Sequence, residues 1–409
     1  MKKRIFTILP AAFAKLRSPL FRQIDFIVLT MIIASCTGTS SDNEGSGDLD
    51  WKLFRGNAGL SGYSALDLPE NPVLLWSYKG DGRTGSSPVV DNGTTYWCDK
   101  RGQIKGVDLA GKLTFDYDLN TAVEATPMIH DSILYIGRID GQMTALSLTS
   151  KDTIWNYETM GQISASPNLG NFRQQEVIVF GSYDNYFYCI DSHSGKKINQ
   201  FESGYYINGA AALWKNSVLF GGCDAWLRVI DCQTGTPTDS LLLDAYIPAS
   251  PAVMGNFCYV SDYSGDIYEI ELDKGKISRN RKLVTAGNEN GSMVSVPALD
   301  PESLYYLADE QYLCSVDRRK GTVNWKFFLK GSTDESSPLV CNNKVIVCTK
   351  SGIISIHDTA TGNQLWEYDT GEQIVGSPAV IDKHFMILTA KGTLFCFGKK
   401  NQDELNKQK

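Results

Sequence analysis

The segment Asp317-Arg-Arg-Lys-Gly321-Thr-Val-Asn-Trp325 is a clear copy of a pattern that recurs along the chain, and this pattern indicates the fold. It follows the apolar run Tyr312-Leu-Cys-Ser-Val316, which has the character of a β-strand. An Asp four residues before a Gly is typical of a tight turn, since the carboxylate accepts backbone N–H bonds. The aromatic residue then opens a further strand. The segment therefore predicts a strand, a tight turn and an outer strand.

The chain outside this segment repeats the same unit about every 40 residues. Each unit begins with a Ser-Pro pair or an equivalent of it, followed by apolar residues. These pairs are Ser87-Pro88, Thr126-Pro127, Ser166-Pro167, Ala210-Ala211, Ser250-Pro251, Val296-Pro297, Ser337-Pro338 and Ser377-Pro378. A period of this length suits four short strands per unit, as in one blade of a propeller.

A two-residue turn is predicted inside every unit, between the second and third strands. The turn pairs are Arg101-Gly102, Asp140-Gly141, Asp184-Asn185, Asp224-Ala225, Ser264-Gly265, Glu310-Gln311, Ser351-Gly352 and Lys391-Gly392. Several of these pairs supply the positive φ that a two-residue hairpin demands.

The Asp-x-x-x-Gly-x-x-x-Trp pattern resembles the tryptophan-docking repeat of pyrroloquinoline-quinone (PQQ)-type propellers. The stretch Trp51-Lys-Leu-Phe-Arg-Gly-Asn57 resembles a lead-in found in exported members of that superfamily. The resemblance covers residues 51–398 and implies an all-β, eight-bladed propeller of four-stranded antiparallel blades. The units that begin at Ala210 and Ser250 lack the docking aromatic, so we expect less regular outer strands there.

Ring closure follows from the two ends of the repeat region. The last unit stops after Phe397, one strand short, and an unpaired outer strand, Val73-Leu-Leu-Trp-Ser-Tyr78, precedes the first unit. Pairing this strand with the C-terminal blade removes the free sheet edge. Residues 51–398 are therefore predicted to form one domain, and residues 399–409 a polar tail.

The N-terminal region has the features of an export signal. Residues 1–35 combine six Lys/Arg residues with a short apolar run, too short to span a bilayer, and end at a lipobox-like Ile33-Ala34-Ser35-Cys36. We expect lipid on Cys36 and a flexible tether over 36–50; an ordinary signal peptide is the alternative. The whole chain carries −7, and removing the leader's net +5 leaves −12, which argues against nucleic-acid binding.

The nine remaining cysteines lie mostly in apolar strands and are interpreted as small core residues. The alternatives are a metal or redox role, or cross-strand disulfides between Cys223 and Cys232 or between Cys341 and Cys348. The four histidines are scattered over separate repeats without zinc-site spacing, so we predict no metal site. His357, which interrupts an apolar column, is predicted to be a satisfied core residue.

An enzymatic function is not expected. The redox enzymes that share this repeat resemble one another in a vicinal Cys-Cys pair, a calcium site and long insertions; this sequence has no Cys-Cys dipeptide and almost no insertions. It also lacks P-loop, Gly-x-Ser-x-Gly and kinase signatures. We therefore expect no catalytic residue and no bound quinone, the lipid on Cys36 being the one covalent group.

Aromatic residues gather in loops that a propeller places on one face, where exposed aromatics mark recognition sites. The candidate binding face is Tyr183, Tyr186, Tyr205, Tyr206, Trp226, Tyr246, Tyr263 and Tyr312. The candidate channel rim is Arg83, Glu124, Asn208, Glu335 and Gln373. The alternative is that these tyrosines are ordinary half-buried strand ends.

These features predict a monomeric, non-catalytic scaffold that is anchored by lipid in the bacterial cell envelope and binds another protein. Its architecture resembles that of the propeller lipoprotein of the outer-membrane β-barrel assembly machine, which implies the outer membrane, on its periplasmic or its outer side. One alternative is a propeller that binds glycans or small ligands through its aromatic face. A quinoprotein oxidoreductase is the less favoured third hypothesis.

Overall fold

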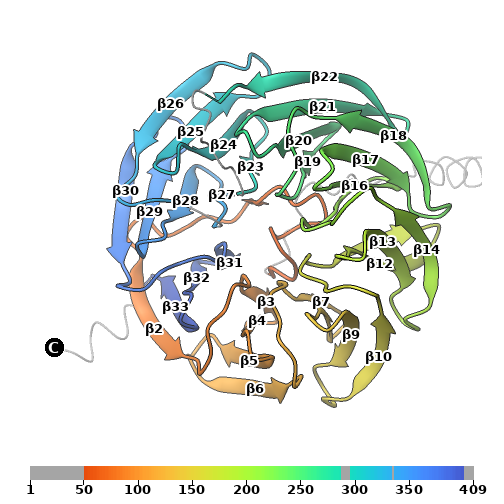
Figure 1. The fold of residues 1–409 in the computed structure, drawn as a ribbon. Coiled ribbons are helices and arrows are strands. Elements are labelled where there is room, and N and C mark those ends of the chain that lie inside the picture. Colours follow the sequence, from red (N-terminus) through yellow and green to blue (C-terminus); the bar gives the residue numbers. More distant parts are fainter. Residues whose placement is uncertain (1–49, 287–294, 334–335, 400–409) are drawn as a thin grey trace, which may run out of the picture. The chain divides into compact units, whose positions relative to one another are not determined.

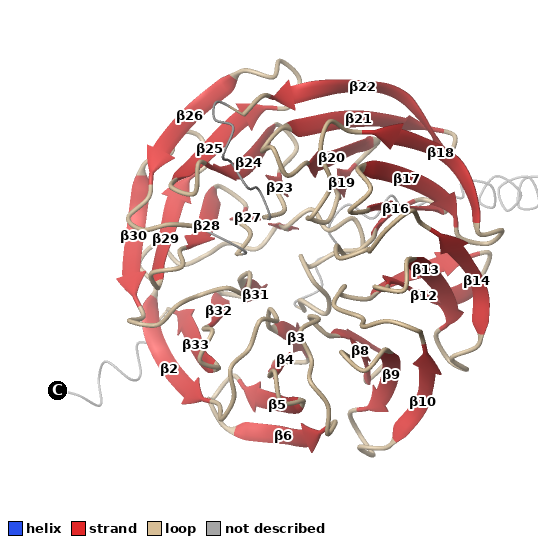
Figure 2. Ribbon diagram, viewed as in Figure 1, coloured by secondary structure: helices blue, strands red, loops and turns tan. Residues whose placement is uncertain are grey.

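The computed structural model describes residues 50–286, 295–333 and 336–399, within one compact unit that spans Gly45–Lys409. In these ranges the regular structure is entirely β, and eight sheets stand in a ring around a central axis (Figures 1 and 2). The predicted all-β, eight-bladed propeller is thereby confirmed. The predicted signal peptide, Cys36, all of the tether but Asp50, and residues 400–409 of the tail lie outside the described residues.

The first four blades follow one another along the chain, each built from four antiparallel strands. Blade 1 is β3 (Val89–Asp91), β4 (Thr94–Cys98), β5 (Gln103–Asp108) and β6 (Leu113–Asp118). Blade 2 is β7 (Met128–His130), β8 (Ile133–Gly137), β9 (Gln142–Ser147) and β10 (Thr153–Glu158). Blade 3 is β11 (Asn168–Phe172), β12 (Gln175–Gly181), β13 (Tyr186–Asp191) and β14 (Lys197–Glu202). Blade 4 is β15 (Ala212–Trp214), β16 (Ser217–Gly221), β17 (Trp226–Asp231) and β18 (Thr236–Leu242).

The last four blades include the two that take strands from the N-terminal end. Blade 5 is β19 (Ala252–Met254), β20 (Phe257–Ser261), β21 (Ile267–Asp273) and β22 (Lys276–Val284). Blade 6 is β23 (Ala298–Leu299), β24 (Ser303–Ala308), β25 (Tyr312–Asp317) and β26 (Val323–Phe328). Blade 7 is β27 (Leu339–Cys341), β28 (Lys344–Cys348), β29 (Ile353–Asp358) and β30 (Gln364–Asp369), with β1 (Tyr63–Ser64) added in parallel to β27. Blade 8 is β31 (Ala379–Ile381), β32 (His384–Leu388), β33 (Thr393–Gly398) and β2 (Val73–Lys79).

Ring closure occurs where the sequence predicts it. Strand β2 pairs antiparallel with β33, with Val73 opposite Gly398 and Trp76 opposite Cys396, so the N-terminal end supplies the outer strand of the last blade (Figure 1). The turns between second and third strands have the predicted positive φ at their second residue in seven blades, for example Gly102 (φ 93) and Ala225 (φ 65). In blade 6 the positive φ instead falls on Asp309 and Glu310, one residue earlier than predicted.

Tryptophan docking joins neighbouring blades. The indole N–H of Trp325 donates to the Thr359 carbonyl at 2.8 Å, and a Cβ on Gly362 would lie 2.6 Å from the indole ring, so the glycine leaves room for it. Trp76 and Trp155 donate in the same way, and in blade 3 the Asn199 amide takes this role.

Two blades were expected to have less regular outer strands because they lack the docking aromatic. That prediction is wrong for β18, which shows one register shift, as the outer strands of the other blades do. Hydrogen bonds from Thr238 to the Gly275 carbonyl and from the Ile277 amide to Asp239 replace the indole contact there. Strand β22 has two register shifts, as expected.

The Ser-Pro residues form a second set of bonds between blades, near the axis. The backbone N–H of Ser337 donates to the Ser377 hydroxyl at 3.1 Å, and that of Ser377 donates to the Ser87 hydroxyl at 2.9 Å. The same bond links further neighbouring blades, as in Ser87 to Thr126 and Val296 to Ser337. We call these contacts the serine latches. Ala210 and Val296 have no hydroxyl to accept such a bond.

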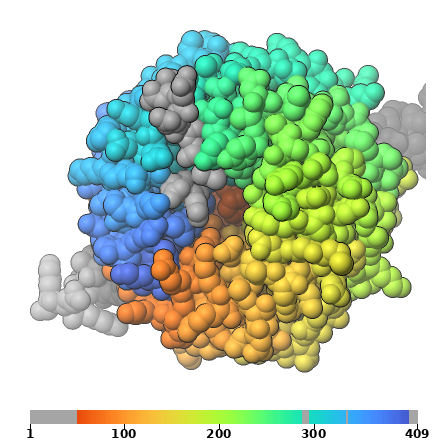
Figure 3. All heavy atoms as spheres, in the orientation of Figure 1, coloured from red at the N-terminus to blue at the C-terminus, as the bar shows by residue number. Residues whose placement is uncertain are grey.

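The lead-in segment 51–64 lies across the inner strands of the ring. Its backbone carbonyls accept bonds from the inner strands of several blades, including the bond from Val253 N to Gly59 O (2.7 Å) and that from Val340 N to Gly62 O (2.9 Å). Arg55 is buried and donates to the carbonyls of Pro297 and Pro338, which precede the inner strands of blades 6 and 7; burial lowers the pKa of Arg55 to about 9. A hollow at the ring's centre shows the red N-terminal end inside it (Figure 3).

The predicted core residues are buried. None of the nine cysteines of the described chain has a covalent bond to another sulfur in the structure; eight of them are buried and Cys223 is half-buried. Neither disulfide alternative is formed: Cys341 lies opposite Lys344 in its hairpin, and the sulfur that contacts Cys232 belongs to Cys189. His357 is fully buried, with Nδ1 at 3.1 Å from the Gly362 carbonyl and Nε2 at 2.9 Å from the Ser355 hydroxyl, so its prediction as a satisfied core residue is confirmed.

Candidate binding face

The loops that carry the predicted aromatic face are joined by backbone hydrogen bonds. Among the described residues, seven of the loops from an outer strand to the next inner strand accept a bond from a turn between second and third strands. We call the side with these loops and turns the upper face. The Tyr183 N–H donates to the Gln162 carbonyl at 3.0 Å, and that of Tyr263 to the Tyr246 carbonyl at 2.9 Å. The same bond between turn and loop occurs in blades 3 to 5 and holds the backbone of these tyrosines in place.

Five predicted residues make two groups of packed rings on neighbouring loops, which we together call the inner tyrosine cluster: Tyr183, Tyr205 and Tyr206 in one, Tyr246 and Tyr263 in the other. Tyr183 stacks on Tyr206 with ring centroids 5.0 Å apart, and Tyr246 stacks on Tyr263 at 4.3 Å. Tyr205 packs against Tyr206 at 4.5 Å and is 50% exposed. Four of the five side chains are exposed and Tyr183 is half-buried, so the cluster is an ordered aromatic surface open to solvent.

The other three predicted aromatics sit apart from this cluster, each at the first residue of a third strand. Tyr186, Trp226 and Tyr312 begin β13, β17 and β25, and Trp226 is exposed while the two tyrosines are half-buried. The residues opposite them on the neighbouring outer strands are Glu202, Leu242 and Phe328. The structure therefore divides the predicted face into an inner cluster and an outer row.

Three exposed apolar residues belong to this face and were missed in the sequence. Leu242 and Phe328 are each 56% exposed beside Trp226 and Tyr312, and Met160 is 93% exposed in the loop before blade 3. The Met160 backbone N–H donates to Asp184, which ties this loop to the turn that bears Tyr183. The signal that identifies Leu242 and Phe328 is their register opposite the predicted aromatics.

Carboxylates frame the aromatic side chains and are held by specific partners. Asp184 accepts bonds from the Tyr188 hydroxyl at 2.7 Å and from the backbone of Tyr186. Burial opposes ionisation of Asp224, but the hydrogen bond and charge of Arg228 hold the pKa of Asp224 below its usual value. Burial and contact with Tyr263 raise the pKa of Tyr246 to about 12, so this hydroxyl stays protonated at neutral pH. The face therefore combines the protonated phenol of Tyr246 with the ionised carboxylate of Asp224.

The predicted channel rim is only partly assembled. Arg83 and Gln373 occupy equivalent loop positions, where their carbonyls accept bonds from Lys100 and Ala390. Glu124 and Asn208 lie two residues beyond the equivalent position, because Ala122 and Tyr206 make that bond in their loops. Glu335 lies outside the described residues. The four described residues thus share the upper face but do not form one ring.

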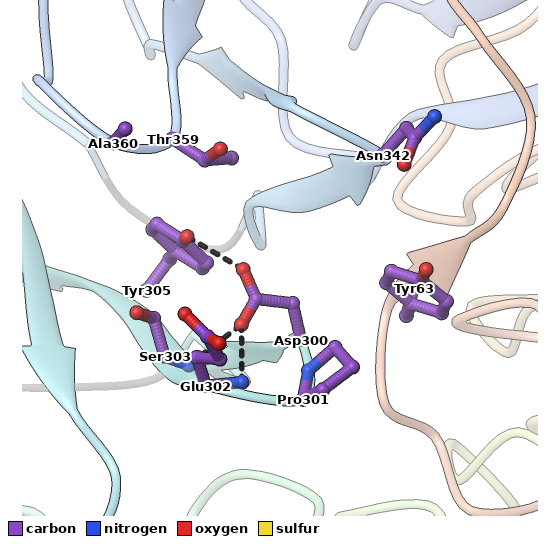
Figure 4. Close-up of a pocket in the computed structure, with 9 residues that line it drawn as sticks. All are labelled: Tyr63, Asp300, Pro301, Glu302, Ser303, Tyr305, Asn342, Thr359 and Ala360. Carbon is purple, nitrogen blue, oxygen red and sulfur yellow. Dashed lines mark hydrogen bonds between the residues drawn. The ribbon is translucent and has the colours of Figure 1, made fainter.

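A recess of about 360 Å³ lies elsewhere, between blades 6 and 7 beside strand β1 (Figure 4). Asp300 is its central acid, and it accepts bonds from the Tyr305 hydroxyl at 2.7 Å and from the backbone of Ser303 at 2.6 Å. Because these bonds already use the carboxylate oxygens, Asp300 is a structural acceptor at the blade junction. We assign no chemistry to this recess.

A second group of polar residues has potential metal ligands. Nε2 of His130 lies 3.1 Å from Glu176 and 3.5 Å from Asp131, and the three ligand atoms lie within 4.8 Å of one another. The sequence did not predict this cluster, because Glu176 is in the next repeat. In the structure His130 pairs with Glu176 through a hydrogen bond that needs no metal.

Three described cations on the upper face are paired with carboxylates. Lys100 contacts Glu124 at 3.0 Å, Arg138 contacts Asp140, and Arg228 contacts Asp224. Among the described residues, no helix has the length and hydropathy needed to cross a bilayer.

The closed ring, the docked tryptophans and the aromatic upper face define an eight-bladed propeller of the tryptophan-docking class. The chain belongs to the family whose model is described as "Outer membrane protein assembly factor BamB", which matches residues 62–327 and 309–406. The resemblance to PQQ-type propellers and to the assembly-machine lipoprotein is thereby confirmed.

Individual relatives are distant. The BamB of Shewanella oneidensis is 22% identical over 64% of this chain and 67% of its own length. The BamB of Legionella pneumophila is 25% identical, and the alignment covers 41% of either chain. The crystal structure of BamB from Moraxella catarrhalis superposes with a TM-score of 0.67 at 18% identity, over 81% of this chain and 98% of that one.

The same fold also occurs in enzymes. The quinohemoprotein alcohol dehydrogenase of Comamonas testosteroni superposes with a TM-score of 0.70 at 15% identity, over 88% of this chain and 82% of that chain. In sequence, the dehydrogenase of that name is 25% identical, but the alignment covers only 35% of its length. Fold alone therefore does not separate a scaffold from an oxidoreductase, and function must be argued from the site.

Proposed function

We propose that this chain is a non-catalytic scaffold of the bacterial outer membrane that binds another envelope protein through its upper face. The inner tyrosine cluster is the observation that carries the proposal, because it exposes aromatic area that is already ordered by stacking. Side chains held in place before binding lose little conformational entropy on contact, and aromatic anchors dominate protein interfaces. Family membership supports the same reading.

The partner's chemistry follows from the composition of the face. Phenol rings, Trp226 and Met160 offer apolar contact, while Asp184 and Glu310 add negative charge beside them. A partner with an apolar patch bordered by Lys or Arg matches this arrangement. The lipid on Cys36 would hold the scaffold at the membrane, which leaves the propeller face available to that partner.

The test is recovery of partners from the organism's own membranes with the full-length, lipidated chain as bait. We expect one envelope protein to be recovered with the wild type and at least tenfold less with the double variant Tyr205→Ala/Trp226→Ala. Leu365→Ala is the matched control, because Leu365 is equally exposed (46%) but lies on the outer strand of blade 7. Equal recovery by the wild type and the double variant would contradict the assigned face.

Glycan binding is the second candidate, favoured by the parallel stacking of Tyr246 on Tyr263, with an interplanar angle of 22°. Such rings act as platforms for sugar faces. If no protein is recovered and cell-envelope glycans raise the melting temperature of the wild type but not of Tyr263→Ala, the scaffold proposal fails and the glycan reading replaces it.

A further inference from the structure

Two cysteines from neighbouring blades lie in direct contact in the core. Cys189 is in β13 of blade 3, and Cys232 follows Asp231, the last residue of β17 in blade 4. Their Sγ atoms are 2.7 Å apart, closer than two sulfurs in ordinary van der Waals contact. Each residue is 1% exposed, within an apolar cluster that joins the two blades. Among the described residues no other pair of cysteine sulfurs makes such a contact.

The repeat shows that this position is a regular contact between blades. The equivalent residues of blades 4 and 5 are Val229 and Leu272, which share one core cluster. The equivalents in blades 5 and 6 are Glu269 and Arg318. There the Tyr259 hydroxyl donates to Glu269 at 2.9 Å and accepts from Arg318 at 3.0 Å. An apolar pair, a charged pair bridged by a tyrosine hydroxyl and a thiol pair thus occupy the same place, and at the junction of blades 3 and 4 both members are cysteine.

We propose that Cys189 and Cys232 form a disulfide that joins blade 3 to blade 4 in the exported protein. Each thiol loses its proton, one sulfur–sulfur bond forms, and two electrons pass to an external disulfide, which is reduced to two thiols. This oxidant belongs to the oxidising compartment that the export signal predicts. The inference does not depend on the proposed partner binding.

The bond forms before the two blades have closed on each other. Contact with Cys189 and burial both raise the pKa of the Cys232 thiol, so the reactive thiolate is disfavoured in the folded core. At 1% exposure neither sulfur is reachable by an external disulfide in the closed ring. Exchange therefore takes place during folding, and the finished disulfide is then shielded from reductants.

The test begins with the full-length protein isolated from cell envelopes, acid-quenched and alkylated in denaturant without reductant. Proteolysis and mass spectrometry should yield one crosslinked peptide pair that contains Cys189 and Cys232 and disappears after reduction. The free-thiol count should be seven of the nine cysteines that follow Cys36. Alkylation of both residues without reductant would overturn the proposal.

A variant built from the repeat itself gives a second readout. Cys189→Val/Cys232→Leu copies the apolar pair of blades 4 and 5, so it is expected to fold without the bond. Reductant present during unfolding should lower the melting temperature of the wild type by several degrees and leave that of the variant unchanged. Protein that is fully reduced and then refolded in a glutathione redox buffer should regain the bond. Its absence there would be a second, independent contradiction of the pairing.

Discussion

Removing one serine latch should destabilise the ring at its closure. In Ser87→Ala the backbone N–H of Ser377 loses its hydroxyl acceptor. The residue Ser377 is only 4% exposed, so water does not readily replace that acceptor. A buried donor left without a partner costs about 1–3 kcal/mol. With an unfolding entropy of about 2.1 cal/mol/K per residue, a domain of about 350 residues changes its melting temperature by roughly 1.4 °C per kcal/mol. The expected decrease is therefore about 1.5–4 °C.

Calorimetry and urea unfolding followed by tryptophan fluorescence measure this change. Ser87→Thr should behave like the wild type, because Thr126 already accepts the same bond in blade 2. Ser77→Ala, an exposed serine on β2, is the control for loss of a hydroxyl. Ala210→Ser should stabilise the ring by about 0.5–1.5 kcal/mol, since it offers Ser166 an acceptor. If Ser87→Ala and Ser77→Ala unfold at the same urea concentration, the latches contribute nothing and the reasoning is refuted.

Three further predictions concern the lead-in, the docking contact and the buried histidine. Gly62→Ala should cost at least 2 kcal/mol more than Gly255→Ala. Both glycines have φ +62, but only a Cβ at Gly62 would clash, because it would lie 2.0 Å from the buried guanidinium of Arg55. Equal melting temperatures of the two variants would argue against a packed lead-in. Trp325→Phe should lower the free energy of unfolding by about 1 kcal/mol, because it removes the indole hydrogen bond of 2.8 Å. Trp366→Phe should lower it less, because the ring contacts of Trp366 are apolar. Equal losses in urea titrations would count against docking by a hydrogen bond. Burial lowers the pKa of His357 below 6.5, so the unfolded chain binds a proton more readily than the folded chain. The free energy of unfolding should therefore fall as the pH drops below 6.5 and level off below the folded pKa. In urea titrations at pH 7.5 and 5.5, His357→Gln should abolish this dependence.

The fold was predictable because the sequence pattern that specifies each blade is short and recurs along the chain. The turn pairs, the Asp-x-x-x-Gly turns and the docking tryptophans each act within about 40 residues. The role of Arg55 was not predictable in this way, because its acceptors Pro297 and Pro338 lie 242 and 283 residues away. The contact of Cys189 with Cys232 was missed because pairs were sought within one blade, whereas equivalent positions face each other across blades.

The candidate face was predictable as a set of residues but not as an arrangement. The tyrosines were found because all lie in loops of one type, and the stacking of Tyr183 on Tyr206 depends on the register between a loop and the preceding blade's turn. Leu242 and Phe328 were overlooked, since an apolar residue near the end of an outer strand has no signal of its own. Their exposure becomes clear only in the folded structure, which shows which side of the outer strand faces solvent.

The N-terminal end of the propeller bears on which face binds a partner. Segment 51–64 bonds to inner strands from blade 1, through Trp51, to blade 7, through Gly62, while β2 completes blade 8. Segment 51–64 therefore bonds to the inner strands of blades 1 to 7, and its backbone groups occupy the positions that it covers. The central hollow, with the N-terminal end inside it, is visible in Figure 3. Because segment 51–64 covers the inner strands, we place the proposed partner on the upper face, where the inner tyrosine cluster is exposed.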